Sequence, residues 1–126
     1  MQSKFIFIAA LLGAFSVVLG AFGAHGLKPK LTPDQLQVFE TAVRYQFYHT
    51  FAILACALLM DKYAISPYIL YSFLLGIVFF SGSLYLLSCR ELLGLTNWKW
   101  LGPITPIGGL LFIIGWLWLA ISVLKE

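Results

Sequence analysis

Four long apolar stretches, separated by short polar segments, make up almost the whole chain. They cover about residues 4–26, 33–61, 67–89 and 104–124. Each stretch approaches or exceeds the roughly 20 residues that an α-helix needs to cross the hydrocarbon core of a bilayer. The pattern therefore predicts an all-α integral membrane protein, in which residues 1–126 form a single membrane domain built as a bundle of four transmembrane helices.

A hydroxyl residue followed by proline marks the expected start of three of these helices. The pairs are Thr32-Pro33, Ser66-Pro67 and Thr105-Pro106. The hydroxyl can cap the free N–H groups of the first turn, and a proline at the first helical position lacks only an N–H that would have no partner. Thr32 and Gln35 also have the spacing of a capping box.

The second helix is predicted to be longer than the membrane core is thick. From Pro33 to Asp61 it measures about 43 Å at a rise of about 1.5 Å per residue, whereas the hydrocarbon core is about 30 Å thick. Its first part alternates apolar and polar residues at helical spacing, with Leu36, Phe39, Val43 and Phe47 on one side and Asp34, Gln37, Glu40 and Arg44 elsewhere. We therefore expect an amphipathic extension that protrudes, tilts or kinks where it enters the membrane.

The first apolar stretch resembles a signal peptide, because Lys4 precedes it and the run Ala-Phe-Gly-Ala can pass for a cleavage site. The apolar run from Phe5 to about Ala24 is nevertheless long enough to span a membrane, unlike the core of a typical signal peptide. We expect it to be retained as a helix.

The composition agrees with lipid as the surrounding solvent. The chain is 61% hydrophobic and 10% charged, whereas a soluble domain holds about 25% charged residues. Its formal charge of +3 is spread over the ends of the segments, without the basic run that nucleic acid would require. The expected partners are therefore membrane lipids and not nucleic acid.

Two cysteines, Cys56 and Cys89, lack CxxC or metal-ligand spacing. We expect buried or interfacial thiols. A reactive Cys89, activated by the neighbouring Arg90, is the alternative.

Small residues recur at helical spacing and indicate close helix contacts, because small side chains let helices approach one another in lipid. They are Gly13, Ser16, Gly20 and Gly23 in the first helix, Ser72 and Gly76 in the third, and Gly108 and Gly115 in the fourth. The contacts can lie within one chain or between subunits, and we expect a homo-oligomer.

The polar residues of the four helices are predicted to gather near one membrane face. At about 1.5 Å per residue, His25 reaches the side where the first loop emerges, and Arg44 lies about 25 Å from Asp61, near that same side. Thr105 and the serines of the third helix reach the same level. The candidate site is a polar cup lined by His25, Arg44, Tyr45, Gln46, Tyr48, His49, Ser81, Ser83, Tyr85 and Thr105.

Four segments resemble the signature of a known family. They are GAFGAHGL (20–27), TAVRYQFYHT (41–50), FSGSLYLLS (80–88) and ITPIGGLLFIIGW (104–116). They are similar to a small family of multi-span membrane proteins of unknown function, catalogued as domain of unknown function 423, and transmembrane protein 256 is similar too. The resemblance implies a multi-spanning membrane protein of about this size. It brings no established activity, substrate or set of catalytic residues.

Arg44 has two interpretations. It can be an interfacial arginine that snorkels to the membrane surface, pairs with Glu40 and fixes the depth of the second helix. It can also hold a phosphate or carboxylate, for which a guanidinium is a natural bidentate partner.

Other chemistries find less support in the sequence. His25 and His49 can be imagined as axial haem ligands, but the depth estimate puts them on different levels, so we expect no metal and no cofactor. Ser81 and Ser83 lack the GxSxG context of a hydrolase and, being two residues apart, point to different sides of the helix. We expect these serines to pack and hydrogen-bond between helices, in a protein that is not an enzyme.

The leading hypothesis is a non-enzymatic membrane protein whose polar cup binds lipid headgroups or a small amphiphile. The alternative is a small transporter or channel that uses the same residues, and a haem- or metal-binding membrane protein is more distant. We expect a multi-pass protein of the cell membrane with both termini on one side. The face of the first and third loops carries five cations against three, which favours a cytoplasmic location for it.

Overall fold

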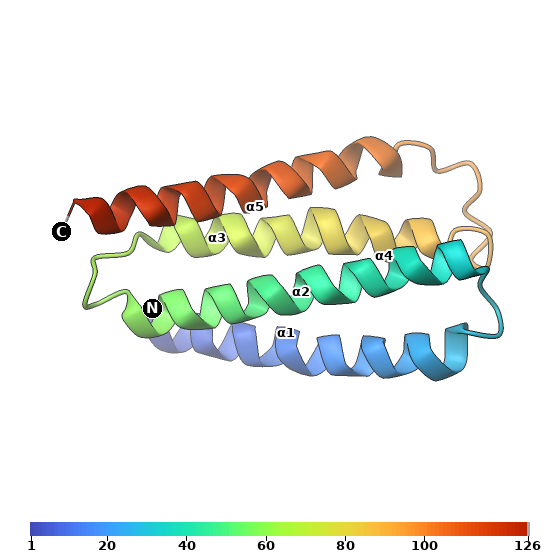
Figure 1. Ribbon diagram of the computed structural model, residues 1–126, viewed down its shortest axis with the longest axis horizontal. Coiled ribbons are helices and arrows are strands. Elements are labelled where there is room, and N and C mark those ends of the chain that lie inside the picture. Colours follow the sequence, from blue (N-terminus) through green and yellow to red (C-terminus); the bar gives the residue numbers. More distant parts are fainter. Residues whose placement is uncertain (126) are drawn as a thin grey trace.

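The chain folds into four antiparallel helical rods, described by a computed structural model over residues 1–125. The elements in chain order are α1 (Gln2–Phe22), η1 (Gly23–Leu27), α2 (Pro33–Leu59), α3 (Pro67–Gly76), η2 (Ile77–Ser81), α4 (Gly82–Ser88) and α5 (Leu101–Leu124). The elements η1 and η2 are turns of wider π-helix. η1 ends the first rod, and η2 joins α3 and α4 into the third. Figure 1 shows both termini at the same end of the molecule.

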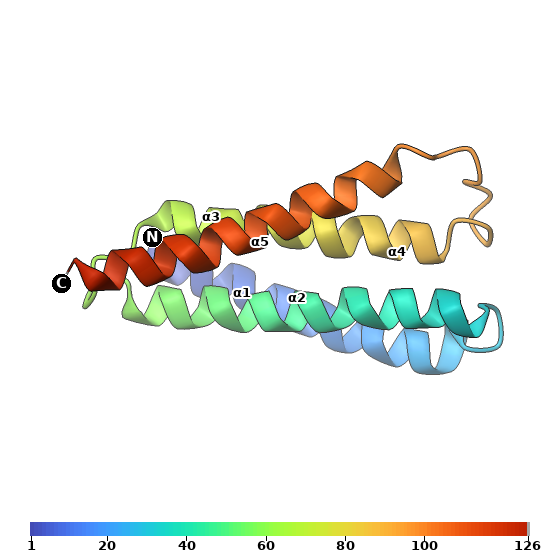
Figure 2. The ribbon, with the colours of Figure 1, turned by 45° about the horizontal axis from the view of Figure 1, so that its top comes forward.

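The rods form two stacked hairpins. α1 packs along α2, while α5 packs against α3 and η2, and α2 joins the two hairpins through its contacts with α3, η2 and α4. Figure 2 shows α5 leaning away from α4 toward the loop that connects them. Both free cysteines, Cys56 and Cys89, are buried in this packing, as expected of unreactive structural thiols.

Two of the three predicted helix starts are confirmed. The Thr32 hydroxyl accepts from the Gln35 backbone N–H at 3.2 Å, and Gln35 Oε1 accepts from the Thr32 N–H at 3.0 Å, so the capping box is complete. The Ser66 hydroxyl likewise accepts from the N–H of Tyr68 at 3.2 Å. Each cap supplies a partner for an N–H that the helix itself leaves free.

The predicted start of the last helix at Thr105-Pro106 is wrong. α5 begins at Leu101, and Pro106 lies inside it. The earlier start is possible because Pro103 falls in the first turn, where a missing N–H breaks no helical hydrogen bond. Pro106, in contrast, deprives the carbonyl of Gly102 of its usual donor. The Thr105 hydroxyl is not a cap and pairs with Ser83 instead.

The small residues meet within one chain. In the first rod, Gly20 of α1 faces Val43 of α2, and a Cβ on Gly23 of η1 would lie 2.8 Å from Phe39 Cε1. In the other hairpin, a Cβ on Gly115 would lie 2.7 Å from Phe73 Cε1. These stripes are therefore occupied by the packing of each hairpin, so they give no support of their own to an oligomer.

Three of the rods are long and apolar enough to cross a membrane, among the helices that residues 1–125 form. They span Gln2–Leu27, Pro67–Ser88 and Leu101–Leu124. α2 is more polar in its first half, where Phe39 and Val43 are buried while Glu40 and Arg44 are exposed. The crossing of the membrane by α2, and the protrusion of its first turns, stay predictions.

The closest helix contact provides a test of the packing. A Cβ on Gly108 would lie 2.3 Å from the backbone N of Phe80, and backbone cannot move aside as a flexible side chain can. We expect Gly108→Ala to destabilise the protein in detergent by about 1–3 kcal/mol, the usual cost of overpacking, as measured by the shift of its thermal unfolding.

The neighbouring glycine is the matched control. A Cβ on Gly109 would make only an ordinary contact of 3.8 Å with Phe80 Cδ2, so Gly109→Ala should keep the stability of the unsubstituted protein. Equal effects of the two substitutions would contradict the close approach of α5 to η2.

Candidate functional site

Gln46 links three helices and is only 4% exposed. Its Nε2 donates to the Leu12 carbonyl of α1 at 3.1 Å, and its Oε1 accepts from the Tyr85 hydroxyl of α4 at 2.6 Å. An amide placed in hydrocarbon is costly unless its donors and acceptor are paired. The side chain of Gln46 is therefore a structural bridge.

The serines of the third rod point in two directions, as their spacing predicts. The hydroxyl of Ser81, at the end of η2, donates to the Ala42 carbonyl of α2 at 2.7 Å. The hydroxyl of Ser83 lies 3.0 Å from the Phe80 carbonyl and 2.5 Å from the Thr105 hydroxyl of α5. One serine therefore ties the rod to α2, and the other ties it to α5.

His49 uses both of its ring nitrogens within the chain. The Trp116 indole N–H donates to Nε2 at 3.0 Å, and Nδ1 lies 2.8 Å from the Tyr45 carbonyl. Because indole is only a donor, Nε2 must accept, and Nδ1 must carry the proton that it donates to the carbonyl. The ring also stacks on Phe112, with centroids 3.5 Å apart. His49 in this state offers no lone pair to a metal or haem.

Three predicted site residues lie outside this network. His25 is exposed in η1, and Arg44 and Tyr48 are exposed on α2. The Arg44 guanidinium donates from Nη2 to the Thr41 hydroxyl at 3.1 Å. Its hydrogen-bond partner is thus Thr41, and not Glu40 as the spacing suggested.

The predicted site residues therefore divide in two. Gln46, His49, Ser81, Ser83, Tyr85 and Thr105 engage one another or the main chain, whereas His25, Arg44 and Tyr48 face outward. Tyr45 belongs to both groups, because its side chain is 37% exposed while its carbonyl accepts from His49. The four segments do meet at one level of the bundle, but most of their polar groups are engaged in hydrogen bonds that link the rods.

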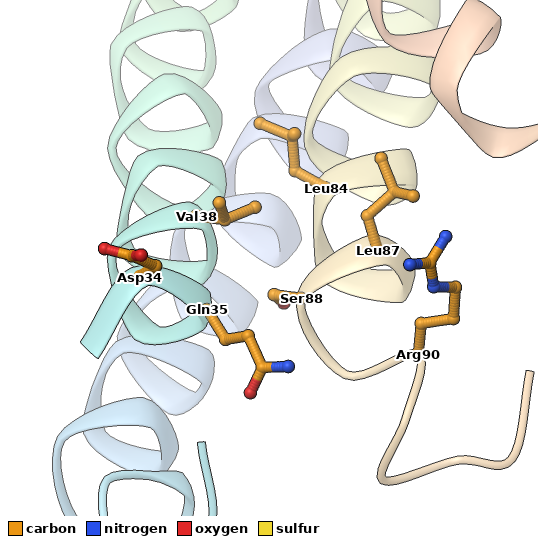
Figure 3. A pocket seen from close by; sticks show the side chains of 7 residues that line it. All are labelled: Asp34, Gln35, Val38, Leu84, Leu87, Ser88 and Arg90. Atoms are coloured by element: carbon orange, nitrogen blue, oxygen red, sulfur yellow. The ribbon is translucent and has the colours of Figure 1, made fainter. Parts of the chain in front are cut away.

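A groove between α2 and α4 holds a different set of polar residues (Figure 3). Its volume is about 340 Å³, and its lining residues are Asp34, Gln35, Val38, Leu84, Leu87, Ser88 and Arg90. Asp34 and Gln35 come from the first turn of α2, Ser88 ends α4, and Arg90 follows it in the loop. The groove has apolar walls and a polar rim.

The rim presents hydrogen-bond donors. The capping box commits Gln35 Oε1 to the backbone N–H of Thr32, which leaves its Nε2 free to donate, and Figure 3 shows that amide extended toward the α4 side. The Nε atom of Arg90 is buried and has no hydrogen-bond partner among the described residues. A buried guanidinium N–H without a partner is costly, so the rim suits an anion. The Asp34 carboxylate also belongs to the lining, and Figure 3 shows it turned away from α4.

The sequence contains a signal for this rim, although the predicted polar cup does not include these residues. Arg90 follows directly on the third apolar stretch, so the depth arithmetic that places Ser81 and Tyr85 near the first loop places Arg90 there as well. Asp34 and Gln35 lie at the predicted start of the second helix, and Gln35 is predicted only as part of the capping box.

The Gln46 bridge can be measured with a double-mutant cycle of Gln46→Leu and Tyr85→Phe. We expect each single substitution to destabilise the protein in detergent, and their coupling energy to be about 0.5–1.7 kcal/mol, the range of interhelical hydrogen bonds in membranes.

Tyr48→Phe is the control for this cycle, because the Tyr48 side chain is 54% exposed. Its effect should stay within about 0.5 kcal/mol. A coupling energy of zero between Gln46 and Tyr85 would show that the bridge does not hold the helices.

The comparisons with known proteins agree with a membrane protein. A "UPF0382 membrane protein" of Staphylococcus haemolyticus is 47% identical, over 96% of this chain and 95% of its own length. Proteins of the same description from Bacillus subtilis, 42% identical over 96% of both chains, and Haemophilus influenzae, 44% identical over 100% of this chain and 98% of its own, are similar. No solved structure matches the chain.

The family model described as "Protein of unknown function (DUF423)" matches residues 19–109. These residues include η1, α2, the third rod and the start of α5, and so the groove between α2 and α4. The resemblance noted in the sequence is thus confirmed, and the chain belongs to this family of membrane proteins of unknown function.

Proposed function

We propose that this non-enzymatic membrane protein binds a glycerophospholipid in the groove between α2 and α4. In this proposal Arg90 holds the phosphate, and the lipid chain lies against the apolar walls. The observation that carries the proposal is the buried Arg90 Nε, which has no hydrogen-bond partner among the described residues and lies on the rim of an apolar groove.

The composition of the groove supports a lipid over a small soluble anion. Val38, Leu84 and Leu87 line it, and an ion such as phosphate would gain nothing from these side chains. A phospholipid satisfies both parts, because its chain covers the apolar walls while its phosphate accepts from a guanidinium.

The charges on the rim favour one kind of headgroup. Arg90 supplies a cation beside α4, and Asp34 supplies a carboxylate on α2, which Figure 3 shows turned away from α4. A headgroup with both a phosphate and an ammonium group, as in phosphatidylethanolamine, matches this pair. A glycerol headgroup can donate hydroxyl hydrogen bonds to Asp34 but offers it no positive charge.

The alternative function, transport through the buried polar residues, has no supporting observation comparable to the unpaired Arg90 Nε. Gln46, His49 and Tyr85 already exchange hydrogen bonds with other groups of the chain. Using them as a pathway would require these bonds to break first.

The proposal can be tested by native mass spectrometry. The protein is incubated with mixed micelles that contain equal amounts of phosphatidylethanolamine and phosphatidylglycerol, and the lipids retained after activation are counted. We expect the groove that contains Arg90 to retain one lipid, with a preference for ethanolamine. Arg90→Gln should weaken its retention about tenfold or more, since a hydrogen bond to a charged group contributes about 1.5–3 kcal/mol.

Arg44→Gln is the matched control, because Arg44 is also an arginine but lies on α2, is exposed and is bonded to Thr41. It should leave lipid retention unchanged. Loss of the lipid in Arg44→Gln alone would show that Arg44, and not Arg90, holds the phosphate. Unchanged retention in Arg90→Gln would exclude the groove as the binding site.

A further inference from the structure

A second groove lies on the opposite side of α4, between the third rod and α5. Its volume is about 270 Å³, and its lining residues are Val78, Phe79, Gly82, Ser83, Leu86, Trp100, Leu101 and Ile104. Trp100 is the residue directly before α5. Apart from Ser83, every lining side chain is apolar or aromatic, or is the single hydrogen of Gly82.

The groove exists because α5 contacts the third rod closely at Gly108 and diverges from α4 between Gly108 and the third loop. A Cβ on Gly108 would lie 2.3 Å from the Phe80 backbone N, so the two backbones meet closely there. Toward the third loop α5 leans away from α4 (Figure 2), and Pro106 falls in this diverging part. The hydroxyl pair of Ser83 and Thr105 is the hydrogen bond that spans the divergence.

The surroundings of the groove identify the kind of occupant. The third rod is one of the three rods apolar enough to span a membrane, and Val78 and Phe79 of the lining are 53% and 36% exposed. The groove therefore opens sideways toward the hydrocarbon of the bilayer. Water has no polar partners to keep it there, because Ser83 is already bonded to Phe80 and Thr105.

The end of the groove at Trp100 fits the level of lipid headgroups. Trp98 and Trp100 lie with their rings 5.3 Å apart, on either side of Lys99 in the sequence. Tryptophan and lysine are typical of the membrane–water interface. A chain that enters the groove from this end has its polar part beside residues that favour it.

We propose that the groove between α4 and α5 is a lateral binding site for one acyl chain of a bilayer phospholipid. The site binds the acyl chain of the lipid and does not select its headgroup. It is separate from the groove that contains Arg90, and it does not depend on the function proposed for that groove.

The glycines of the two helices provide a filling variant and its control. A Cβ on Gly82, which lines the groove, meets nothing within 4 Å, and the same is true of Gly102 on α5, which is not among the lining residues. Gly82→Leu should fill the groove without a clash. Gly102→Leu adds the same side chain outside it.

Native mass spectrometry counts the lipids retained by each variant in micelles of a single phospholipid. We expect Gly82→Leu to retain one lipid fewer than the unsubstituted protein and Gly102→Leu, with either an ethanolamine or a glycerol headgroup. Arg90→Gln should keep this second lipid. Unchanged retention in Gly82→Leu, or a lipid-free dimer that Gly82→Leu dissociates, would overturn the proposal, the latter because a second copy would then fill the groove.

Fluorescence gives an independent measurement if Gly82→Leu does not fold. In a protein with Trp98, Trp116 and Trp118 replaced by Phe, lipids brominated on the acyl chain should quench Trp100. Leu86→Phe, which fills the groove from α4 without adding a second tryptophan, should lower the chain-specific quenching of Trp100 at least twofold. Equal quenching with and without a filled groove would show that no chain enters it.

Discussion

The arrangement of the molecule depends on one constraint: a polar side chain buried among apolar helices must find its hydrogen-bond partners within the chain. Gln46 is the clearest example, because its amide donates to the Leu12 carbonyl of α1 and accepts from the Tyr85 hydroxyl of α4. Ser81 meets the same constraint through the Ala42 carbonyl. Each pairing is possible only when the rods have one rotation and one depth relative to each other, so the polar groups determine the register of the apolar surfaces.

The two grooves are a consequence of that register. Glycines hold α5 against the third rod at Gly108 and Gly115, while toward the third loop α5 leans away from α4 (Figure 2). The other groove lies between α4 and the first turns of α2. The Arg90 groove combines apolar walls with a charged rim, and the Trp100 groove is almost wholly apolar. In our account the two surfaces select different parts of a lipid, the headgroup in one and the chain in the other.

The sequence predicted the four helices and two of their caps, because hydrophobic length and Ser/Thr-Pro signals act locally. It missed the start of α5 because Thr105-Pro106 looks like a cap, whereas tertiary contact with Ser83 uses that hydroxyl elsewhere. The helical rise brought the polar segments to one level. It could not tell that Gln46 and Tyr85 face each other while Arg44 faces outward, since that depends on the rotation of packed helices. The helical rise also places Arg90 at that level, but the burial of its Nε arises from packing beside α4 and has no pattern in the sequence.

The central claim is that buried polar side chains bridge the helices, and solid-state NMR of the protein in phospholipid bilayers tests it most directly. The measurement is the dipolar coupling between the side-chain nitrogen of Gln46 and the carbonyl carbon of Leu12. A close contact between them, with the Gln46 amide protons shielded from water, is the result that our account predicts. A missing contact together with strong magnetisation transfer from water to the Gln46 amide would contradict it, because Gln46 would then line an open polar cavity.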